Sequence, residues 1–298
     1  MRILVLLHST TGNTRLMMQH ACRWFERQGH EVLLFDVTRG ACPDPNDFDL
    51  LGVANPTMYF RGTLTMDRIL INLPAARRAL HPVFLYATCG GEPGAQFDIY
   101  ADLLADKGYR VIGAKYNLAP SNYPHHRFLA DHTRLLNPVA LRLAALSPHV
   151  RPLVGLFSHV ALEPTPSDRD DLEAFCRVVL ETASSPRVGM PAVEKLHPCL
   201  PGVKAMGFSM TREKIARFTR FTVDPKRCTA CGVCVKLCPE QVISLAGEAF
   251  MPVFGPGCNG CYTCYNHCPE GAIRVAPLPA GAARYHGPSA QMRRLFED

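Results

Sequence analysis

Two short cysteine runs constrain this chain more than any other feature of its sequence. Both have the form C-x2-C-x2-C-x3-C-P, and the second repeats the first after 30 residues: Cys228, Cys231, Cys234, Cys238 and Pro239, then Cys258, Cys261, Cys264, Cys268 and Pro269. Eight of the 13 cysteines lie in these runs. Thiolates at such short spacing indicate ligands of a metal centre rather than disulfides, so a reducing compartment, by default the cytoplasm, is expected.

The spacing of the cysteines predicts two [4Fe–4S] clusters. Three thiolates separated by two-residue gaps reach three corners of one cubane, and the fourth cysteine of each run ligates the other cluster. We therefore expect cluster one on Cys228, Cys231, Cys234 and Cys268, and cluster two on Cys258, Cys261, Cys264 and Cys238. Zinc is disfavoured, because zinc sites carry four ligands each with a longer gap between ligand pairs.

The first 180 residues show a different pattern, in which short apolar segments alternate with amphipathic ones. This alternation is typical of an α/β domain with a parallel sheet. Strands are expected at 3–7, 31–36, 50–54, 83–87 and 110–115, and helices at 14–28, 68–80, 98–107 and 168–182.

The segment after the first expected strand has the composition of an anion site. It reads Ser9, Thr10, Thr11, Gly12, Asn13, Thr14 and opens directly into a helix. Hydroxyls and free backbone N–H groups at a helix N-terminus bind anions. The segment has neither the lysine of a Walker A loop nor the G-x-G-x-x-G dinucleotide pattern. A cradle without a cation suits the monophosphate of FMN.

Further loops follow the other expected strands. Ligands of open α/β sheets bind outside the carboxyl ends of the strands. Tyr59 could therefore stack on a flavin ring, and the glycine-rich backbone after the fourth strand could bond the polar edge of that ring. A role without flavin contact stays open for Tyr59, Tyr123 and Cys89. The residues concerned are Asn55, Pro56, Thr57, Met58 and Tyr59 after the third strand, Thr88, Cys89, Gly90 and Gly91 after the fourth, and Asn122 and Tyr123 after the fifth.

Residues 9–14 match the flavodoxin pattern Ser/Thr-x-T-G-N-T, and the N-terminal part resembles a flavodoxin over 1–120 and 166–183. Residues 220–278 resemble a bacterial two-cluster ferredoxin. The whole chain resembles the flavodoxin–ferredoxin fusions of the EFR-type ferredoxin family. This resemblance implies a doubly wound α/β parallel sheet of order 2-1-3-4-5, a C-terminal α+β ferredoxin domain, FMN and two [4Fe–4S] clusters.

Composition predicts where the domains divide. We expect a flavodoxin-like domain over 1–183, a linker rich in proline and glycine over 184–203, and a ferredoxin domain with a C-terminal tail over 204–298. An apolar, proline-punctuated insertion at 124–166 departs from the minimal flavodoxin pattern. It is read as a helical hairpin that caps the domain, or as a surface for a partner or a lipophilic substrate.

Charge indicates the kind of partner. The formal net charge is +6, and residues 201–298 carry 12 Lys/Arg against 7 Asp/Glu. An acidic protein redox partner is therefore expected. Nucleic acid is disfavoured, because no basic helix has interleaved aromatic residues. No window reaches the roughly 20 apolar residues of a membrane span, and the apolar start is read as a strand rather than a signal peptide. The sequence is compatible with a homo-oligomer.

The leading hypothesis is an electron-transfer protein that passes electrons between FMN and the two clusters and on to a partner oxidoreductase. Two alternatives stay open. One is a flavin-dependent reductase of a small or lipophilic substrate bound under the 124–166 insertion. The other is a redox-sensing or partner-binding module.

Overall fold

The computed structural model describes residues 1–124, 139, 142, 162–184, 199–276, 278, 282 and 284–297. Most of the expected insertion at 124–166 and of the expected linker at 184–203 lies outside these residues. The N-terminal part holds a five-stranded sheet with the order β2-β1-β3-β4-β5, in which all neighbours are parallel. This confirms the expected flavodoxin-like sheet. Its strands are β1 (Arg2–Leu7), β2 (Glu31–Asp36), β3 (Leu50–Pro56), β4 (His81–Cys89) and β5 (Tyr109–Leu118).

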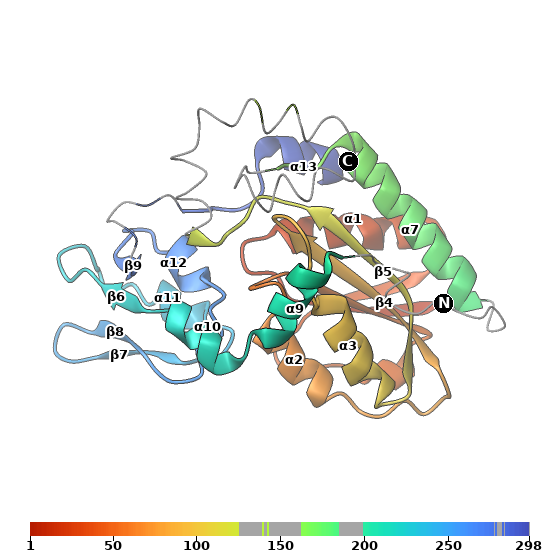
Figure 1. Ribbon diagram of the computed structural model, residues 1–298, viewed down its shortest axis with the longest axis horizontal. Coiled ribbons are helices and arrows are strands. Elements are labelled where there is room, and N and C mark those ends of the chain that lie inside the picture. The colour runs from red at the N-terminus through yellow and green to blue at the C-terminus, as the bar shows by residue number, and fades with distance from the viewer. Residues whose placement is uncertain are drawn as a thin grey trace.

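Helices cover both faces of the sheet (Figure 1). Alternate residues of β1 point to opposite faces, so Ile3, Val5 and Leu7 enter one core while Leu4 and Leu6 enter the other. On the first face lie α1 (Asn13–Arg27), α7 (Pro166–Ser184) and the C-terminal helix α13 (Ala290–Glu297). On the second lie α2 (Leu64–Ile71) and α3 (Gln96–Ala105), and a short 3-10 turn, η1 (Pro45–Asp47), precedes β3.

Helix α2 lies earlier in the chain than the sequence suggested. The expected helix at 68–80 is wrong in position, because α2 runs from Leu64 to Ile71. The Thr63 hydroxyl accepts a hydrogen bond from the Met66 N–H at 3.3 Å and caps the helix N-terminus. Pro74 disfavours helical backbone at the residue before it, so the chain leaves the helix before residue 74.

The ferredoxin-like part consists of two small antiparallel sheets and several short helices. Each cysteine run leads into a one-turn helix, and the residue before that helix has a left-handed backbone: Gly232 with φ 71° and Tyr262 with φ 56°. The elements are α10 (Arg212–Phe218), β6 (Phe221–Val223), α11 (Val233–Lys236), β7 (Ile243–Ala246), β8 (Met251–Phe254), α12 (Thr263–Asn266) and β9 (Ile273–Val275).

Two C-terminal segments pack on the flavodoxin-like sheet domain rather than on the small sheets. Helix α9 (Pro201–Ser209) lies beside α3, where Lys204 pairs with Asp98 at 2.8 Å. In α13, Met292 and Phe296 are fully buried in the core that contains α1. Figure 1 shows α13 against α1 and α7, far from the small sheets. None of the described helices is long and apolar enough to cross a membrane.

Candidate functional site

A polar pocket of about 340 Å³ lies at the carboxyl edge of the parallel sheet. It is formed by the segments that follow β1, β3, β4 and β5, which is the usual ligand position in open α/β sheets. Its lining residues are Ser9, Thr10, Thr11, Asn13, Thr14, Pro56, Thr57, Thr88, Cys89, Gly90, Ala119, Pro120, Ser121 and Asn122.

One end of this pocket is built to receive an anion. Helix α1 starts there after Gly12, whose φ is 103° and which has no side chain to cap the helix, and the Ser9 hydroxyl accepts a hydrogen bond from the Arg15 N–H of the first turn at 3.3 Å. Four lining residues at the helix start carry hydroxyls, Ser9, Thr10, Thr11 and Thr14, and none of the lining residues carries a positive charge. The nearby Arg15 instead pairs with Asp36 at 2.5 Å. Backbone amides, hydroxyls and the helix dipole together fit a phosphate monoester such as that of FMN.

The structure brings most of the sequence-predicted flavin residues to this pocket. Eleven of them line it, and the sequence analysis missed three neighbours, Ala119, Pro120 and Ser121. These were missed because β5 continues to Leu118, beyond the expected strand end at 115. The predicted residues outside the lining are Gly12, Asn55, Met58, Tyr59, Gly91 and Tyr123.

Asn55 is fully buried beneath the pocket and holds the surrounding loops. Its side chain accepts a hydrogen bond from the Thr63 hydroxyl at 2.8 Å and donates one to the Tyr100 hydroxyl at 2.7 Å. His8 joins the same network through Nδ1, 2.7 Å from the Thr63 hydroxyl oxygen. Burial lowers the pKa of His8 to about 4, so this imidazole is neutral at pH 7. Sequence reasoning missed His8, although it directly precedes the anion loop.

Tyr59 and Tyr123 form an aromatic cluster with Tyr262 of the ferredoxin-like part. Ring centroids lie 5.7 Å apart for Tyr59 and Tyr123, and 5.3 Å apart for Tyr123 and Tyr262. The Tyr59 hydroxyl donates a hydrogen bond to the Tyr262 hydroxyl at 2.7 Å. Tyr59 and Phe60 both have positive φ, 54° and 60°. Tyr59 and Tyr123 therefore join the flavodoxin-like domain to Tyr262 of the ferredoxin-like part, and none of the three lines the polar pocket.

The eight cysteines of the two runs gather around two separate cavities. One, of about 350 Å³, is lined by Cys228, Cys231, Cys234 and Cys268. The other, of about 320 Å³, is lined by Cys238, Cys258, Cys261 and Cys264. Each cavity thus takes three cysteines from one run and the fourth from the other, which is the crossed arrangement of two-cluster ferredoxins.

Each cysteine cavity is lined by four thiols, which is the donor set of a [4Fe–4S] cubane. Among the described residues, which include all eight cysteines, no group of three or more His, Cys, Asp or Glu converges closely enough to hold one metal ion. None of the eight forms a disulfide. Burial raises the pKa of the Cys261 thiol to about 12, so a bound cluster must displace its proton. Cluster ligation would supply one-electron redox chemistry here.

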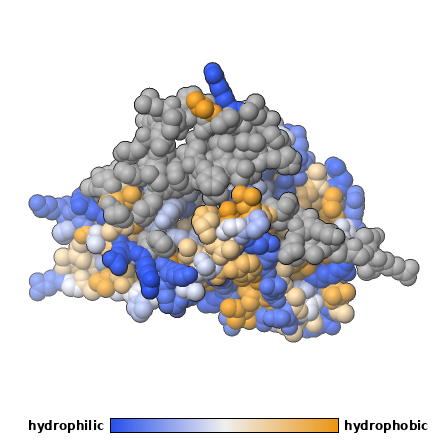
Figure 2. Space-filling model, in the orientation of Figure 1, coloured by the Kyte–Doolittle hydropathy of each residue, from blue (hydrophilic) through white to orange (hydrophobic). Residues whose placement is uncertain are grey.

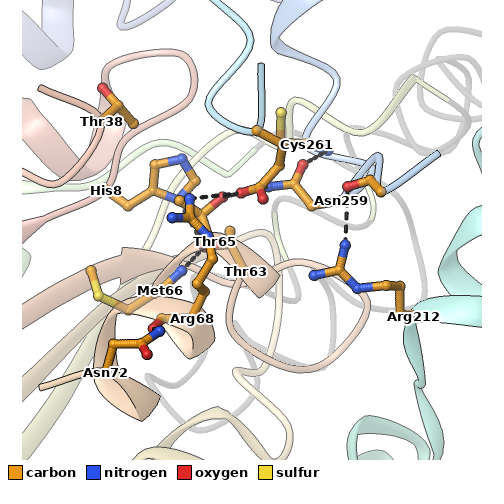
Figure 3. Close-up of polar contacts among 12 residues, drawn as sticks. His8, Thr38, Thr63, Thr65, Met66, Arg68, Asn72, Arg212, Asn259 and Cys261 are labelled. Carbon is orange, nitrogen blue, oxygen red and sulfur yellow. Dashed lines mark hydrogen bonds and ion pairs between the residues drawn. The ribbon is translucent and has the colours of Figure 1, made fainter. Parts of the chain in front are cut away.

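A buried polar network fixes the second cavity against the flavodoxin-like domain (Figure 3). The Thr65 hydroxyl of α2 donates to the Glu240 carboxylate at 2.7 Å and accepts from the Asn259 amide at 2.5 Å. Arg68 lies 3.5 Å from the same carboxylate, and the Asn259 carbonyl accepts from the Cys261 N–H at 3.1 Å. Glu240 and Asn259 line the cavity of Cys261, so this network joins that cavity to α2.

A single side chain connects the polar pocket to the same cysteine cavity. Asn122 is 8% exposed, lines the pocket and donates hydrogen bonds to the Thr10 hydroxyl at 2.8 Å and to the Cys261 carbonyl at 3.4 Å. Its own carbonyl accepts from the Asn266 amide at 3.0 Å. The candidate anion loop and one candidate cluster loop are therefore one residue apart.

Residues 227–273 match the family described as a 4Fe-4S dicluster domain. The sequence has no match among curated proteins. Similar solved structures include a flavodoxin from Archaea, with 14% identity, 62% of this chain and 99% of that chain covered and a TM-score of 0.42. The two-electron reduced flavodoxin of Megasphaera elsdenii has 20% identity, 39% and 85% coverage and a TM-score of 0.35. The rubredoxin oxygen:oxidoreductase of Desulfovibrio gigas has 13% identity and a TM-score of 0.40, and the match covers 62% of this chain and 36% of that chain.

The sheet order of the N-terminal part, β2-β1-β3-β4-β5, is that of a flavodoxin-like fold. A flavodoxin-like sheet domain and a 4Fe-4S dicluster domain are thus joined in one chain. The chain therefore combines an α/β domain of flavodoxin-like fold with an iron–sulfur domain of the two-cluster ferredoxin kind.

Proposed function

We propose that this protein holds FMN in the polar pocket and two [4Fe–4S] clusters in the cysteine cavities, and passes electrons between them and on to a partner oxidoreductase. The observation that carries the proposal is the Asn122 bridge. One side chain bonds both to the anion loop, at Thr10, and to the backbone of the cluster-two loop, at Cys261. Electron exchange between the two sites needs such proximity.

The phosphate end of FMN would meet the α1 N-terminus and the hydroxyls of Ser9, Thr10, Thr11 and Thr14. The ring end would meet the segments 56–57 and 88–90. Bound flavin supplies the exchange between two-electron and one-electron chemistry. The chain contributes an anion site without a cation, a polar edge for orientation and a ferredoxin-like part that covers one side of the site.

The proposed cluster ligands are Cys228, Cys231, Cys234 and Cys268 for cluster one, and Cys258, Cys261, Cys264 and Cys238 for cluster two. Support comes from the two cavities, each lined by one of these sets. We also propose the domain division 1–183, 184–203 and 204–298, with the addition that α9 and α13 pack back on the first domain.

The direct test is cofactor content followed by kinetics. Protein purified without oxygen should release one FMN for about eight irons after denaturation. Stopped-flow reduction should then show electrons redistributing between flavin and clusters within one chain, at a rate that does not depend on protein concentration. Full iron content without flavin, even after FMN is added, would contradict the proposal. So would full loading without exchange.

A further inference from the structure

The two cysteine runs are structural repeats, so each residue around one run has a counterpart 30 positions away around the other. Equivalent residues of the two runs have similar backbone conformations. Ala230 and its counterpart Gly260 have φ of 52° and 67°, and Gly232 and its counterpart Tyr262 have φ of 71° and 56°. Because the loops share one backbone shape, their side-chain differences show where the two ends of the module act differently.

The cluster-two end is closed by the flavodoxin-like domain. Tyr262 accepts the hydrogen bond from Tyr59 described above. A Cβ at Gly260 would lie 2.7 Å from the Tyr59 hydroxyl oxygen and 2.7 Å from Thr219 Cγ2, so only glycine fits there. This end is committed to an internal contact, and an external partner has no access to it from that side.

The cluster-one end is open. Cys231 is exposed, whereas its counterpart Cys261 is only 7% exposed. Gly232 stands where the other loop has Tyr262, and no atom of the described residues lies within 4 Å of the position of a Cβ there. The cluster-one end therefore lacks a side chain equivalent to Tyr262, which closes the cluster-two end.

The exposed cluster-one end also carries more positive charge than the cluster-two end. Three exposed basic residues lie at the first run, two just before it and one between its third and fourth cysteines, and their counterparts at the second run are uncharged. The acidic residues nearby offset only part of this charge, because Asp224 pairs with Arg274 and Glu270 alone lines the cluster-one cavity. At the end of the molecule that carries the small sheets in Figure 1, Figure 2 shows hydrophilic residues mixed with hydrophobic ones. The basic residues are Lys226, Arg227 and Lys236, and their counterparts are Pro256, Gly257 and Asn266.

We propose that the surface around Cys231, flanked by Lys226, Arg227 and Lys236, is the docking site for an acidic electron-transfer protein. The inference rests on the proposed function and adds an order to it: the cluster-two end serves the flavin, and the cluster-one end serves the partner. A cluster held by Cys228, Cys231, Cys234 and Cys268 would supply one electron at each encounter and lower the oxidation state of the partner's metal centre by one, without transfer of a proton or an atom.

An acidic rubredoxin and a basic cytochrome c are suitable probes of opposite charge. The protein is reduced without oxygen by a stoichiometric amount of dithionite, and the second-order rate of electron transfer to each probe is followed by stopped flow. For rubredoxin the rate should fall steeply as salt rises from about 0.02 M to about 0.5 M, because screening weakens the attraction. For cytochrome c it should rise or stay flat.

Charge reversal locates the surface. In the K226E/R227E/K236E variant the rate to rubredoxin at low salt should fall roughly 10- to 100-fold, while the rate to cytochrome c should rise. A mere change in cluster potential would move both rates in the same direction. The R78E/R177E/R294E variant changes the net charge equally at exposed positions on the flavodoxin-like domain, and it should leave most of the rubredoxin rate intact.

Carbodiimide cross-linking gives a readout without turnover and uses the unaltered chain. Cross-links from rubredoxin carboxylates should map to Lys226 and Lys236 rather than to Lys214, an equally exposed lysine of α10 outside the cluster-one surface. Equal losses in both charge-reversed variants, or cross-links mainly at Lys214 or on the flavodoxin-like domain, would overturn the inference. Flavin and iron are assayed in every variant, so a failure of cofactor loading or of internal exchange is scored against the proposed function instead.

Discussion

At the scale of single residues, hydrogen-bonding side chains rather than charged ones form the candidate flavin site. Asn122 and Asn13 cross-link its loops: Asn122 reaches Thr10, and the Asn13 amide donates to the Pro120 carbonyl at 3.0 Å. Thr14 and Thr88 meet through their hydroxyls at 2.8 Å. A site held this way is poised for an anion, because it has donors without a competing carboxylate.

A carboxylate in the anion loop should therefore abolish phosphate recognition. Thr11 lines the pocket and is 8% exposed. In the Thr11→Asp variant, like-charge repulsion should raise the dissociation constant of FMN by roughly 100-fold. Fluorescence titration of flavin into the apoprotein measures this. Riboflavin, which has no phosphate, is the control ligand and should lose much less affinity. Equal losses for both flavins would show that the phosphate does not sit at this loop.

His81 at the start of β4 predicts a pH dependence of stability. It is 1% exposed, and neither ring nitrogen has a hydrogen-bond partner among the described residues. Burial, reinforced by Arg78, lowers the pKa of His81 to about 4 from 6.5. Between these values the unfolded chain binds more protons, so the stabilisation is complete above pH 6.5 and is lost as the pH falls towards 4.

The His81→Phe variant should remove this part of the acid sensitivity. The fall in unfolding free energy between pH 7 and pH 4 should shrink by about 2 kcal/mol. Urea unfolding followed by the fluorescence of Trp24, the single tryptophan, reports on this domain because Trp24 lies in its core. His286→Phe, at an exposed position, is the control. If the unfolding free energy of His81→Phe falls between pH 7 and pH 4 as much as that of the unaltered protein, His81 does not cause the acid sensitivity.

At the scale of elements, the segment after β3 depends on helix α9. Phe60 has a left-handed backbone, and its carbonyl accepts a hydrogen bond from the Ala95 N–H at 2.9 Å. Gly207 of α9 packs directly on this carbonyl: a Cβ there would lie 2.0 Å from the oxygen and 2.7 Å from the Ala95 nitrogen. Helix α9, which begins within the last residues of the expected 184–203 linker, thus supports the loop that borders the candidate flavin ring.

Two glycines of α9 give a matched pair of variants. Gly207→Ala should destabilise the protein by about 2–3 kcal/mol and weaken FMN binding, because the Phe60 loop must move to make room. Gly202→Ala in the same helix meets no atom of the described residues within 4 Å and should be neutral or stabilise by up to about 1 kcal/mol. Thermal unfolding and flavin titration measure both effects. Equal behaviour of the two variants would refute the close contact.

At the scale of the whole molecule, the chain returns to its starting domain after the ferredoxin-like part. The Tyr285 hydroxyl donates to Asn13 in the anion loop at 2.5 Å, and Phe296 of α13 is buried in the core of α1. The ferredoxin-like part is therefore attached to the flavodoxin-like domain at both of its ends as well as through Thr65, Glu240 and Asn259.

Removal of the buried ring of α13 tests this attachment. Phe296→Ala should lower the unfolding free energy of the flavodoxin-like domain by about 3–4 kcal/mol, because it leaves a cavity in a closed core. Arg294→Ala, on the exposed side of the same helix, should change it by less than about 0.5 kcal/mol. Urea unfolding followed by Trp24 fluorescence separates the two. If both variants unfold alike, α13 is not part of that core.

The parallel sheet and most of the residues that line the polar pocket could be predicted from the sequence, because both follow from patterns among neighbouring residues. Short apolar segments between turn residues predicted all five strands, and the segment 9–14 marked the start of α1. The errors were also local. The prediction of a helix at 68–80 did not take the Thr63 cap and Pro74 into account. The prediction that the last strand ends at 115 left Ala119, Pro120 and Ser121 out of the expected pocket. The expectations for the 124–166 insertion fall mostly on residues outside those that the structure describes.

By itself the sequence determined which cysteines share a cavity, because spacings of two and three residues limit how far each thiolate can reach. It also determined the anion loop, whose donors are consecutive in the chain. Only the tertiary structure decided that the loop of Cys261 faces the candidate flavin pocket and the loop of Cys231 faces solvent. Tyr59 and Tyr262 are 203 residues apart, and Asn122 and Cys261 are 139 apart. Contacts at such separations depend on how two folded surfaces fit together, and no local pattern encodes that fit.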